Sequence, residues 1–138
     1  MAIIETGWRD SWRSNDASLI VGGTVQHVEG AEKGSEVMQV VTDRGVLTLF
    51  HKQDCCEVVE IEDVTGDPSD LIGGVVTVFE VRSSENEDPP SGCADSWTWT
   101  FYALRTTRGD LTVRWLGESN GYYSEEVSHH WSPAGGAS

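Results

Sequence analysis

The residues from His51 to Glu57 carry the most reactive side chains of this 138-residue chain: an imidazole, two carboxylates and two thiols within one short segment. Zinc binds Cys and His ligands in a tetrahedral array, so His51, Cys55 and Cys56 are candidate metal ligands. Adjacent cysteines on an extended chain point to opposite sides, however, and no second ligand pair is visible. The alternative is a tight corner between two strands, with one cysteine buried and the carboxylates accepting backbone N–H bonds.

A second polar segment, Gly117 to Ser124, combines two glycines, Ser and Asn side chains and two adjacent tyrosines. This composition is typical of adaptable recognition loops, although one tyrosine could instead pack back on a sheet. We predict that the two segments meet as a shallow polar cleft for a ligand or for a protruding side chain of a partner. Its residues would be His51, Asp54, Glu57, Glu118, Asn120 and Tyr122.

Catalysis is the alternative use of the same side chains. Glu118 could act with Glu57 or Glu60 as an acid–base couple. His51, Asp54 and Glu118 could also serve a metal-dependent hydrolase. The sequence contains no G-x-S-x-G, P-loop, Rossmann or H-E-x-x-H motif. It therefore favours a non-enzymatic protein that needs no cofactor and no metal ion.

The charge of the chain is strongly negative and unevenly distributed. The formal net charge is −14, and residues 51–95, with 12 acidic and 2 basic residues, account for −10 of it. Such a field repels nucleic-acid phosphates and anionic membranes and attracts basic partners. We therefore expect no direct nucleic-acid binding and no membrane association. A simpler explanation is that the acidic face only keeps the protein soluble.

The location of the protein can be inferred from what the sequence lacks. No apolar run approaches the ~20 residues that cross a bilayer, and the first residues have neither the basic nor the apolar region of a signal peptide. Three cysteines without an export signal predict reduced thiols in a cytosol.

Alternating apolar and polar residues predict an all-β fold in a single domain. Strands are expected near 19–29, 36–41, 46–51, 57–64, 71–81 and, as a hairpin, 96–116. Asp67 and Pro68 predict a single helical turn with Asp67 as its N-cap. In the last hairpin we expect one buried face, made of Trp97, Trp99 or Phe101 together with Leu111, Val113 and Trp115.

An internal repeat refines this fold. LIVGGTVQHVE at 19–29 resembles LIGGVVTVFE at 71–80, and TDRGVLTLFH at 42–51 resembles TTRGDLTVRW at 106–115. We predict a sandwich or a strongly curved β-roll built from two pseudo-repeated strand–hairpin units, with at most one or two short helical turns. The two polar segments would then leave equivalent ends of their hairpins.

The expected domain organisation is an arm at 1–18, a β domain at 19–131 and a flexible tail at 132–138. The arm contains Trp8 and Trp12, which together are too much apolar area to leave in water. The arm should therefore dock on the domain or on a second copy, which would make the protein a homodimer.

The chain resembles a family of small uncharacterised proteins found largely in bacteriophages and in some bacteria. The similarity lies in the strings DCCEVVEIEDVTGDPSDLIG, DSWTWTFYALRTTRGDLTVRW and GESNGYYSEEV, and it covers roughly residues 19–128. It implies a phage-type protein made in the cytoplasm of the bacterial host, without an established activity.

We therefore expect an accessory binding protein, directed against host defence or metabolism, that occupies a host bacterial protein or captures a small ligand. Besides the hydrolase, two alternatives stay open. An acidic mimic of nucleic acid would use the 51–95 carboxylates to occupy the basic groove of a host protein. A sponge for a nucleotide-like messenger would need cationic donors, and those available are Arg105, Arg108, Arg114 and His51.

Overall fold

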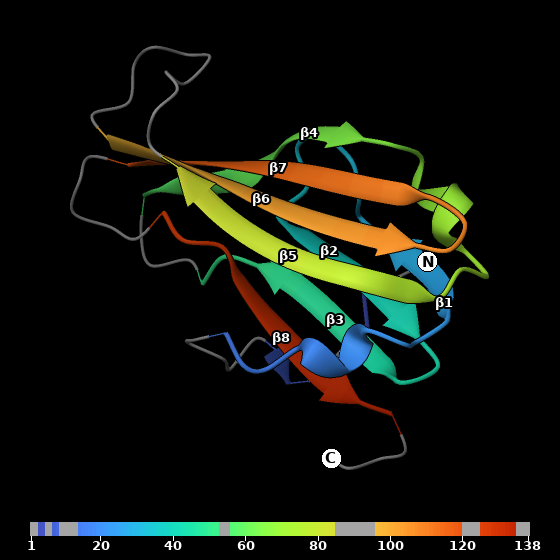
Figure 1. Cartoon of the computed structure of the whole chain (residues 1–138). Coiled ribbons are helices and arrows are strands. Elements are labelled where there is room, and N and C mark those ends of the chain that lie inside the picture. Colours follow the sequence, from blue (N-terminus) through green and yellow to red (C-terminus); the bar gives the residue numbers. More distant parts are fainter. Residues whose placement is uncertain are drawn as a thin grey trace.

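The computed structural model describes residues 3–4, 7–8, 14–52, 56–84, 96–119 and 125–134. These residues form eight β-strands and two 3-10 turns, and none of their helices is long and apolar enough to span a bilayer (Figure 1). The elements are η2 (Ser18–Ile20), β1 (Val25–Glu29), β2 (Val37–Thr42), β3 (Gly45–Phe50), β4 (Val58–Thr65), η3 (Pro68–Leu71), β5 (Val76–Ser84), β6 (Ser96–Thr106), β7 (Asp110–Ser119) and β8 (Ser128–Pro133). The predicted all-β class is confirmed.

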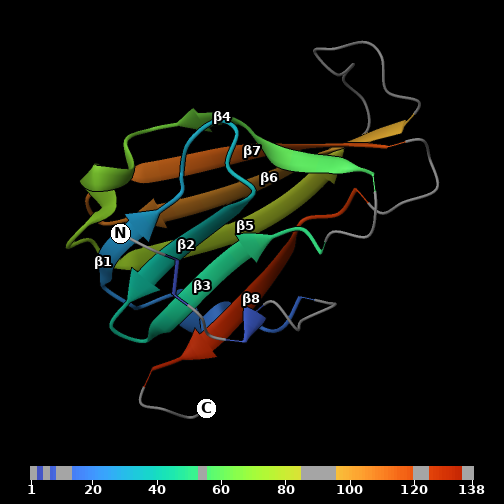
Figure 2. The same cartoon turned by 180° about the vertical axis from the view of Figure 1, so that it is seen from behind.

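The strands form two antiparallel four-stranded sheets that face each other across one core (Figures 1 and 2). The first sheet has the order β1-β2-β3-β8 and the second β4-β7-β6-β5. The chain passes from the first sheet to the second between β3 and β4, and returns between β7 and β8. These two crossings contain the two polar segments that the sequence singled out.

The buried face of β7 is the predicted one, since Leu111, Val113 and Trp115 belong to the core. The predicted face of β6 is wrong. Tyr102 lies directly opposite Val113, and residues directly opposite each other point to the same face of a sheet. The core side of β6 is therefore the one that carries Tyr102 and Leu104, not the one with the aromatic run.

The aromatic run of β6 lies on the outer face of the second sheet. Trp99 is buried there, 3% exposed, and the guanidinium of Arg114 lies 4.9 Å from the centre of its ring. Phe101, opposite Arg114 in the register, is only partly buried. A cation held over an aromatic ring shields it from water, so these large side chains do not require a place in the core.

The two halves of the chain repeat one structural unit. The order η2, β1, β2, β3 in the first half matches η3, β5, β6, β7 in the second. The fourth strand of each sheet comes from the other half of the chain: β8 pairs with β3, and β4 pairs with β7. His51 follows the turn glycine Gly45 at the same distance in sequence as Trp115 follows Gly109, and both side chains are buried.

The two units join through two glycine dipeptides, Gly22-Gly23 before β1 and Gly73-Gly74 before β5. Side chains would not fit there, since a Cβ at Gly74 would lie 2.6 Å from Thr106 Oγ1. Four reciprocal backbone bonds connect the segments, as expected around a pseudo-twofold axis. They run from Gly22 N to Val76 O (2.8 Å), Gly73 N to Val25 O (2.8 Å), Val25 N to Gly74 O (2.9 Å) and Val76 N to Gly23 O (2.9 Å).

The N-terminal arm contacts the domain of its own chain. Trp8 is 4% exposed and packs on Phe50, with 5.2 Å between the ring centres. The backbone of Ile4 exchanges two hydrogen bonds with the side-chain amide of Gln39. Burial of Trp8 therefore requires no second copy of the protein. Trp12 lies outside the described residues.

The helical turn predicted after β4 is present as η3. Asp67 accepts a hydrogen bond from the backbone N–H of Ser69, and Pro68 is the first residue of the turn. Cys56 differs from expectation, because it is disulfide-bonded. The prediction of reduced thiols is wrong for this cysteine, and cysteine usage no longer argues for a cytosol.

Candidate functional site

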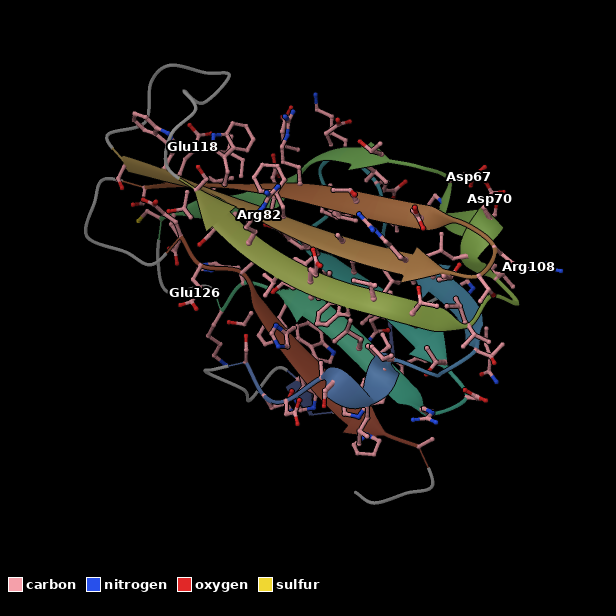
Figure 3. All side chains as sticks on the ribbon, in the orientation of Figure 1. Asp67, Asp70, Arg82, Arg108, Glu118 and Glu126 are labelled. Atoms are coloured by element: carbon pink, nitrogen blue, oxygen red, sulfur yellow. The ribbon has the colours of Figure 1, made fainter. Side chains whose placement is uncertain are left out.

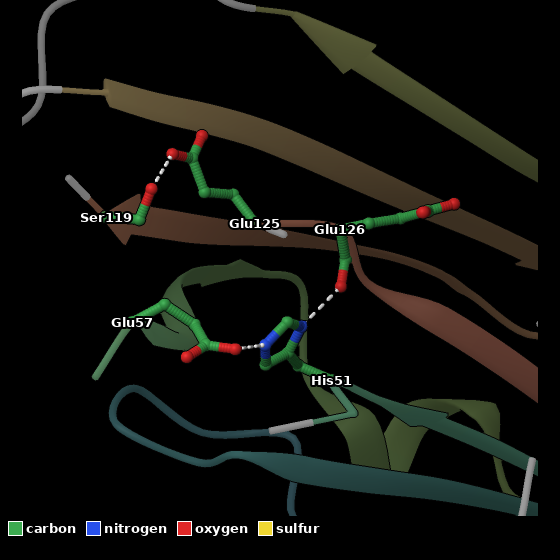
Figure 4. A network of polar contacts seen from close by, with 5 residues as sticks. All are labelled: His51, Glu57, Ser119, Glu125 and Glu126. Atoms are coloured by element: carbon green, nitrogen blue, oxygen red, sulfur yellow. Dashed lines mark hydrogen bonds and ion pairs between the residues drawn. The ribbon is translucent and has the colours of Figure 1, made fainter. Parts of the chain in front are cut away.

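The two crossing segments meet at one end of the sandwich through His51 (Figure 4). Its Nδ1 lies 2.7 Å from the backbone carbonyl oxygen of Glu126, in the segment before β8. Its Nε2 lies 2.7 Å from a carboxylate oxygen of Glu57, just before β4. The side chains of His51 and Glu57 are 4% and 0% exposed. The contact therefore links the connections before β4 and β8 in a buried setting.

The partners of His51 restrict its chemistry. A carbonyl oxygen only accepts hydrogen bonds, so Nδ1 carries a hydrogen and donates it to Glu126. One further proton is shared between Nε2 and the carboxyl group of Glu57, either as an ion pair or as two neutral groups. Both ring nitrogens are thus engaged, and His51 has no free lone pair for a metal ion or a substrate proton. Among the described residues, no three His, Cys, Asp or Glu side chains form a group that could hold a metal ion.

A second buried carboxylate lies beside this pair. Glu125 is 8% exposed and accepts hydrogen bonds from the hydroxyl of Ser119 in β7 and that of Thr98 in β6, the latter at 2.8 Å. It packs against Gly117, where a Cβ atom would lie only 2.5 Å from its carbonyl oxygen. Gly117 is therefore required by close packing, and Glu125 is held in place by the inner face of the second sheet.

The structure brings two of the predicted cleft residues, His51 and Glu57, into contact. Glu118 is paired with the exposed Val58 at the end of β7 and lies at this same end of the molecule (Figure 3). Neighbouring residues of an extended chain face opposite ways, so Glu118 points away from the buried Glu57. Asp54, Cys55, Asn120 and Tyr122 lie outside the described residues, and their place in the cleft stays a prediction.

A groove of about 400 Å³ opens beside this cluster, between β5, β6 and the segment before β8. Tyr102 and His129 are among its lining residues, and the Tyr102 hydroxyl lies 3.3 Å from both the Val127 carbonyl oxygen and His129 Nδ1. The other residues that line the groove are Ser14, Val81, Arg82, Ser83, Thr98, Thr100, Glu125, Glu126 and Val127. Its volume is within the range of sites for small molecules.

The groove offers neutral and acidic groups. Burial, and then the charge of Glu126, raises the pKa of Tyr102 well above its usual value, so the phenol keeps its proton. Burial lowers the pKa of His129, which favours the neutral imidazole. Arg82 contributes no cation to the interior, since its guanidinium lies on the outer face of the sheet, 5.4 Å from the centre of the Phe101 ring. The carboxylates of Glu125 and Glu126 are the charged groups that remain.

Sequence reasoning missed the groove. Its walls combine β5 and β6 with the distant segment before β8, and the buried face that the sequence predicts for β6 does not include Tyr102. Glu125 and Glu126 belong to the string GESNGYYSEEV, which the sequence did single out, yet their position depends on how the chain crosses between sheets. The detectable signal was the pair of adjacent carboxylates immediately before an apolar residue, Val127.

A family model described as Domain of unknown function (DUF7448) matches residues 18–129. No curated protein and no solved structure matches the chain. The matched part contains seven of the strands in full, the groove walls on β5 and β6, and the His51–Glu57 pair. The chain therefore belongs to this family, Domain of unknown function DUF7448.

Proposed function

We propose that this domain is a non-enzymatic binding protein that captures a small polar ligand with a cationic group in the groove between β5, β6 and Glu125–Val127. The observation that carries the proposal is the composition of the groove: two carboxylates, neutral hydroxyls and an imidazole favoured in its neutral form, with the neighbouring guanidinium of Arg82 turned to the outer face. An amine would find acceptors there and, among the residues that the structure describes, no competing cation.

The phage origin, the role against host defence or metabolism and the location in the host cytoplasm are part of this proposal and rest on the family resemblance. The Lys or Arg side chain of a host protein presents the same chemistry as a free amine. The net charge of −14 would attract such a partner and speed its association.

The geometry gives less support to the alternative functions. A nucleotide sponge needs its cations to converge, but Arg114 pairs with Glu62 on the outer face and Arg108 bonds the backbone at the opposite end of the sandwich. A hydrolase would need a free nitrogen on His51, and both nitrogens are engaged. Acidic mimicry remains the second candidate, since Asp63, Asp67, Asp70 and Glu80 are all exposed.

The test is direct binding with defined probes. The full chain is titrated by calorimetry with spermidine, lysine and glucosamine, and in parallel with adenosine monophosphate and glucose. We expect an amine to bind, with affinity that falls as salt is added, because the attraction is screened. Native mass spectrometry of the protein purified from bacterial cells would show whether such a molecule is retained.

Two matched variants locate the site. Glu126→Gln removes a carboxylate from the groove while keeping the size and shape of the side chain. The substitution should weaken amine binding by about tenfold or more, as expected for the loss of a charged hydrogen-bond partner. Glu118→Gln makes the same change at the same end of the molecule, outside the groove, and should have little effect. Binding of the nucleotide alone, no binding of any probe, or an equal effect of both variants would contradict the proposal.

A further inference from the structure

The edges of the two sheets are not equally protected. The edge of β4 is covered by the connection between β1 and β2, since Gly34 N donates to Ile61 O and Ile61 N donates to Ser35 O, both at 2.8 Å. The edge of β8 is covered by the chain before η2, where the Asn15 side chain bonds both the N–H and the carbonyl of Trp131. A covered edge cannot recruit another strand.

Within the described part of the chain, no segment covers the edge of β5. This strand ends the second sheet, and only its first residue, Val76, bonds to the neighbouring unit. From Val78 to Ser83, the backbone of β5 has no partner other than β6 within the described ranges. The strand has nine residues, whereas β1, which ends the first sheet, has five. A long open edge presents unpaired N–H and C=O groups in the geometry that a further strand requires.

The side chains of this edge are self-complementary. Val81, 49% exposed, stands between Glu80 and Arg82, which are both exposed. In an antiparallel pair related by a twofold axis, residues equally far from the axis but on opposite sides lie opposite each other. With the axis at Val81, Glu80 would face the partner's Arg82, and Arg82 would face the partner's Glu80. Charges that would discourage pairing with an arbitrary strand then favour a second copy.

We propose that two copies of this chain pair through β5, antiparallel and centred on Val81, and so join their second sheets into one continuous eight-stranded sheet. The pairing would satisfy the open backbone groups, cover the two Val81 side chains and form two Glu80–Arg82 pairs. This surface is distinct from the N-terminal arm. It also adjoins the groove, because Val81 and Ser83 line it, so the partner's strand would extend one groove wall.

The test is the oligomeric state of the full chain without added ligand, measured by sedimentation velocity over a wide concentration series. A single pair of edge strands is smaller than a standard protein interface, so we expect a dimer that forms reversibly as concentration rises. Glu80→Arg and Arg82→Glu each place like charges opposite one another in both pairs. Each substitution should weaken the dimer by about tenfold or more.

Charge complementation makes the test specific to this register. The double variant E80R/R82E restores opposite charges and should dimerise like the natural protein. A mixture of the two single variants should form a mixed dimer, because one chain then supplies two arginines and the other two glutamates. Both side chains are exposed, so circular dichroism and thermal melting should show that the single variants remain folded.

The outcomes separate clearly. Recovery of the dimer in the double variant and in the mixture would establish pairing through β5. A protein that stays monomeric at every concentration would overturn the proposal. So would a dimer that both single substitutions leave intact, or one that neither the double variant nor the mixture restores. None of these results depends on whether the groove binds an amine.

Discussion

At the scale of single residues, the molecule contains two histidine–glutamate pairs in contrasting surroundings. His27 and Glu29 lie 2.8 Å apart with side chains 32% and 26% exposed, while His51 and Glu57 lie 2.7 Å apart with side chains 4% and 0% exposed. In the exposed pair, water competes for both partners and screens their charge. In the buried pair, removal of one partner takes from the other the hydrogen bond that joins the two groups, at a site where water does not replace it.

The first prediction compares these pairs. Glu57→Ala should lower the free energy of unfolding by about 3–5 kcal/mol, because His51 Nε2 loses its buried partner. Glu29→Ala should change it by about 0–1 kcal/mol. Urea unfolding at neutral pH measures both values. Equal losses in the two variants would mean that the His51–Glu57 contact does not hold the crossing segments together.

The second prediction concerns His129. Burial lowers its pKa below the usual 6.5, although the nearby Asp16 carboxylate and a hydrogen bond with Asn15 oppose the shift. The unfolded chain therefore binds a proton more readily than the folded one. The resulting stability is fully present above about pH 6.5 and is lost as pH falls through the lower folded value.

Replacement of His129 by Gln removes this contribution. Unfolding free energies of the natural protein and of His129→Gln, measured from about pH 8 down to about pH 5, should therefore converge as the solution becomes acidic. The difference between the two curves isolates His129 from the other titrating groups. Parallel curves would show that His129 is as easily protonated in the folded state as in the unfolded state.

At the scale of elements, the two repeated units show which features were predictable from sequence. The repeat was visible because its turns use local chemistry: the strings around Thr42 and around Thr106 each place a hydroxyl, an arginine and a glycine at fixed spacing. The inner face of β6 was not predictable from alternation. The aromatic residues alternate as a buried face would, but they lie on the outer face of the sheet, where Arg114 covers the ring of Trp99. The groove depends on how the segment before β8 lies against β5 and β6, which no local pattern encodes.

The third prediction tests whether the two turns are energetically equivalent. Thr42 Oγ1 accepts bonds from Arg44 N and Gly45 N, and Thr106 Oγ1 accepts the same bonds from Arg108 N and Gly109 N, all between 3.0 and 3.2 Å. Each hydroxyl also donates to the carbonyl of its turn glycine. Loss of either hydroxyl should therefore remove the same acceptor from two backbone N–H groups in each turn.

Thr42→Val and Thr106→Val should each destabilise the fold by a similar amount, about 1–3 kcal/mol. The control is Thr77→Val, which removes a single exposed hydrogen bond to Arg105 and should cost within about 0.5 kcal/mol. Urea unfolding measures the free energy of unfolding of the three variants and of the natural protein. A large difference between the two turn variants would show that the units share a topology without sharing its energetics.

At the scale of the whole molecule, the dominant property is negative charge. The chain has 23 acidic and 9 basic residues, and the ion pairs between described residues include only one that joins an arginine to a carboxylate, Arg114 with Glu62. Asp16 and Asp67 have pKa values lowered chiefly by hydrogen bonds with Ser18 and Ser69. Those bonds are local and hardly sensitive to salt, whereas repulsion among exposed carboxylates acts over several ångströms and is screened.

The last prediction follows from this balance. At pH 7, added sodium chloride should raise the melting temperature, because screening reduces repulsion in the folded protein more than it weakens the few exposed ion pairs. A gain of about 1 kcal/mol would correspond to a rise of roughly 3–6 °C for a domain of this size. The measurement is thermal melting followed by circular dichroism in increasing salt, with sodium sulfate excluded because it also strengthens apolar burial. A melting temperature that falls with salt would mean that attractive pairs outweigh repulsion, and that the acidic face is neutralised within the fold rather than available to attract a cationic partner.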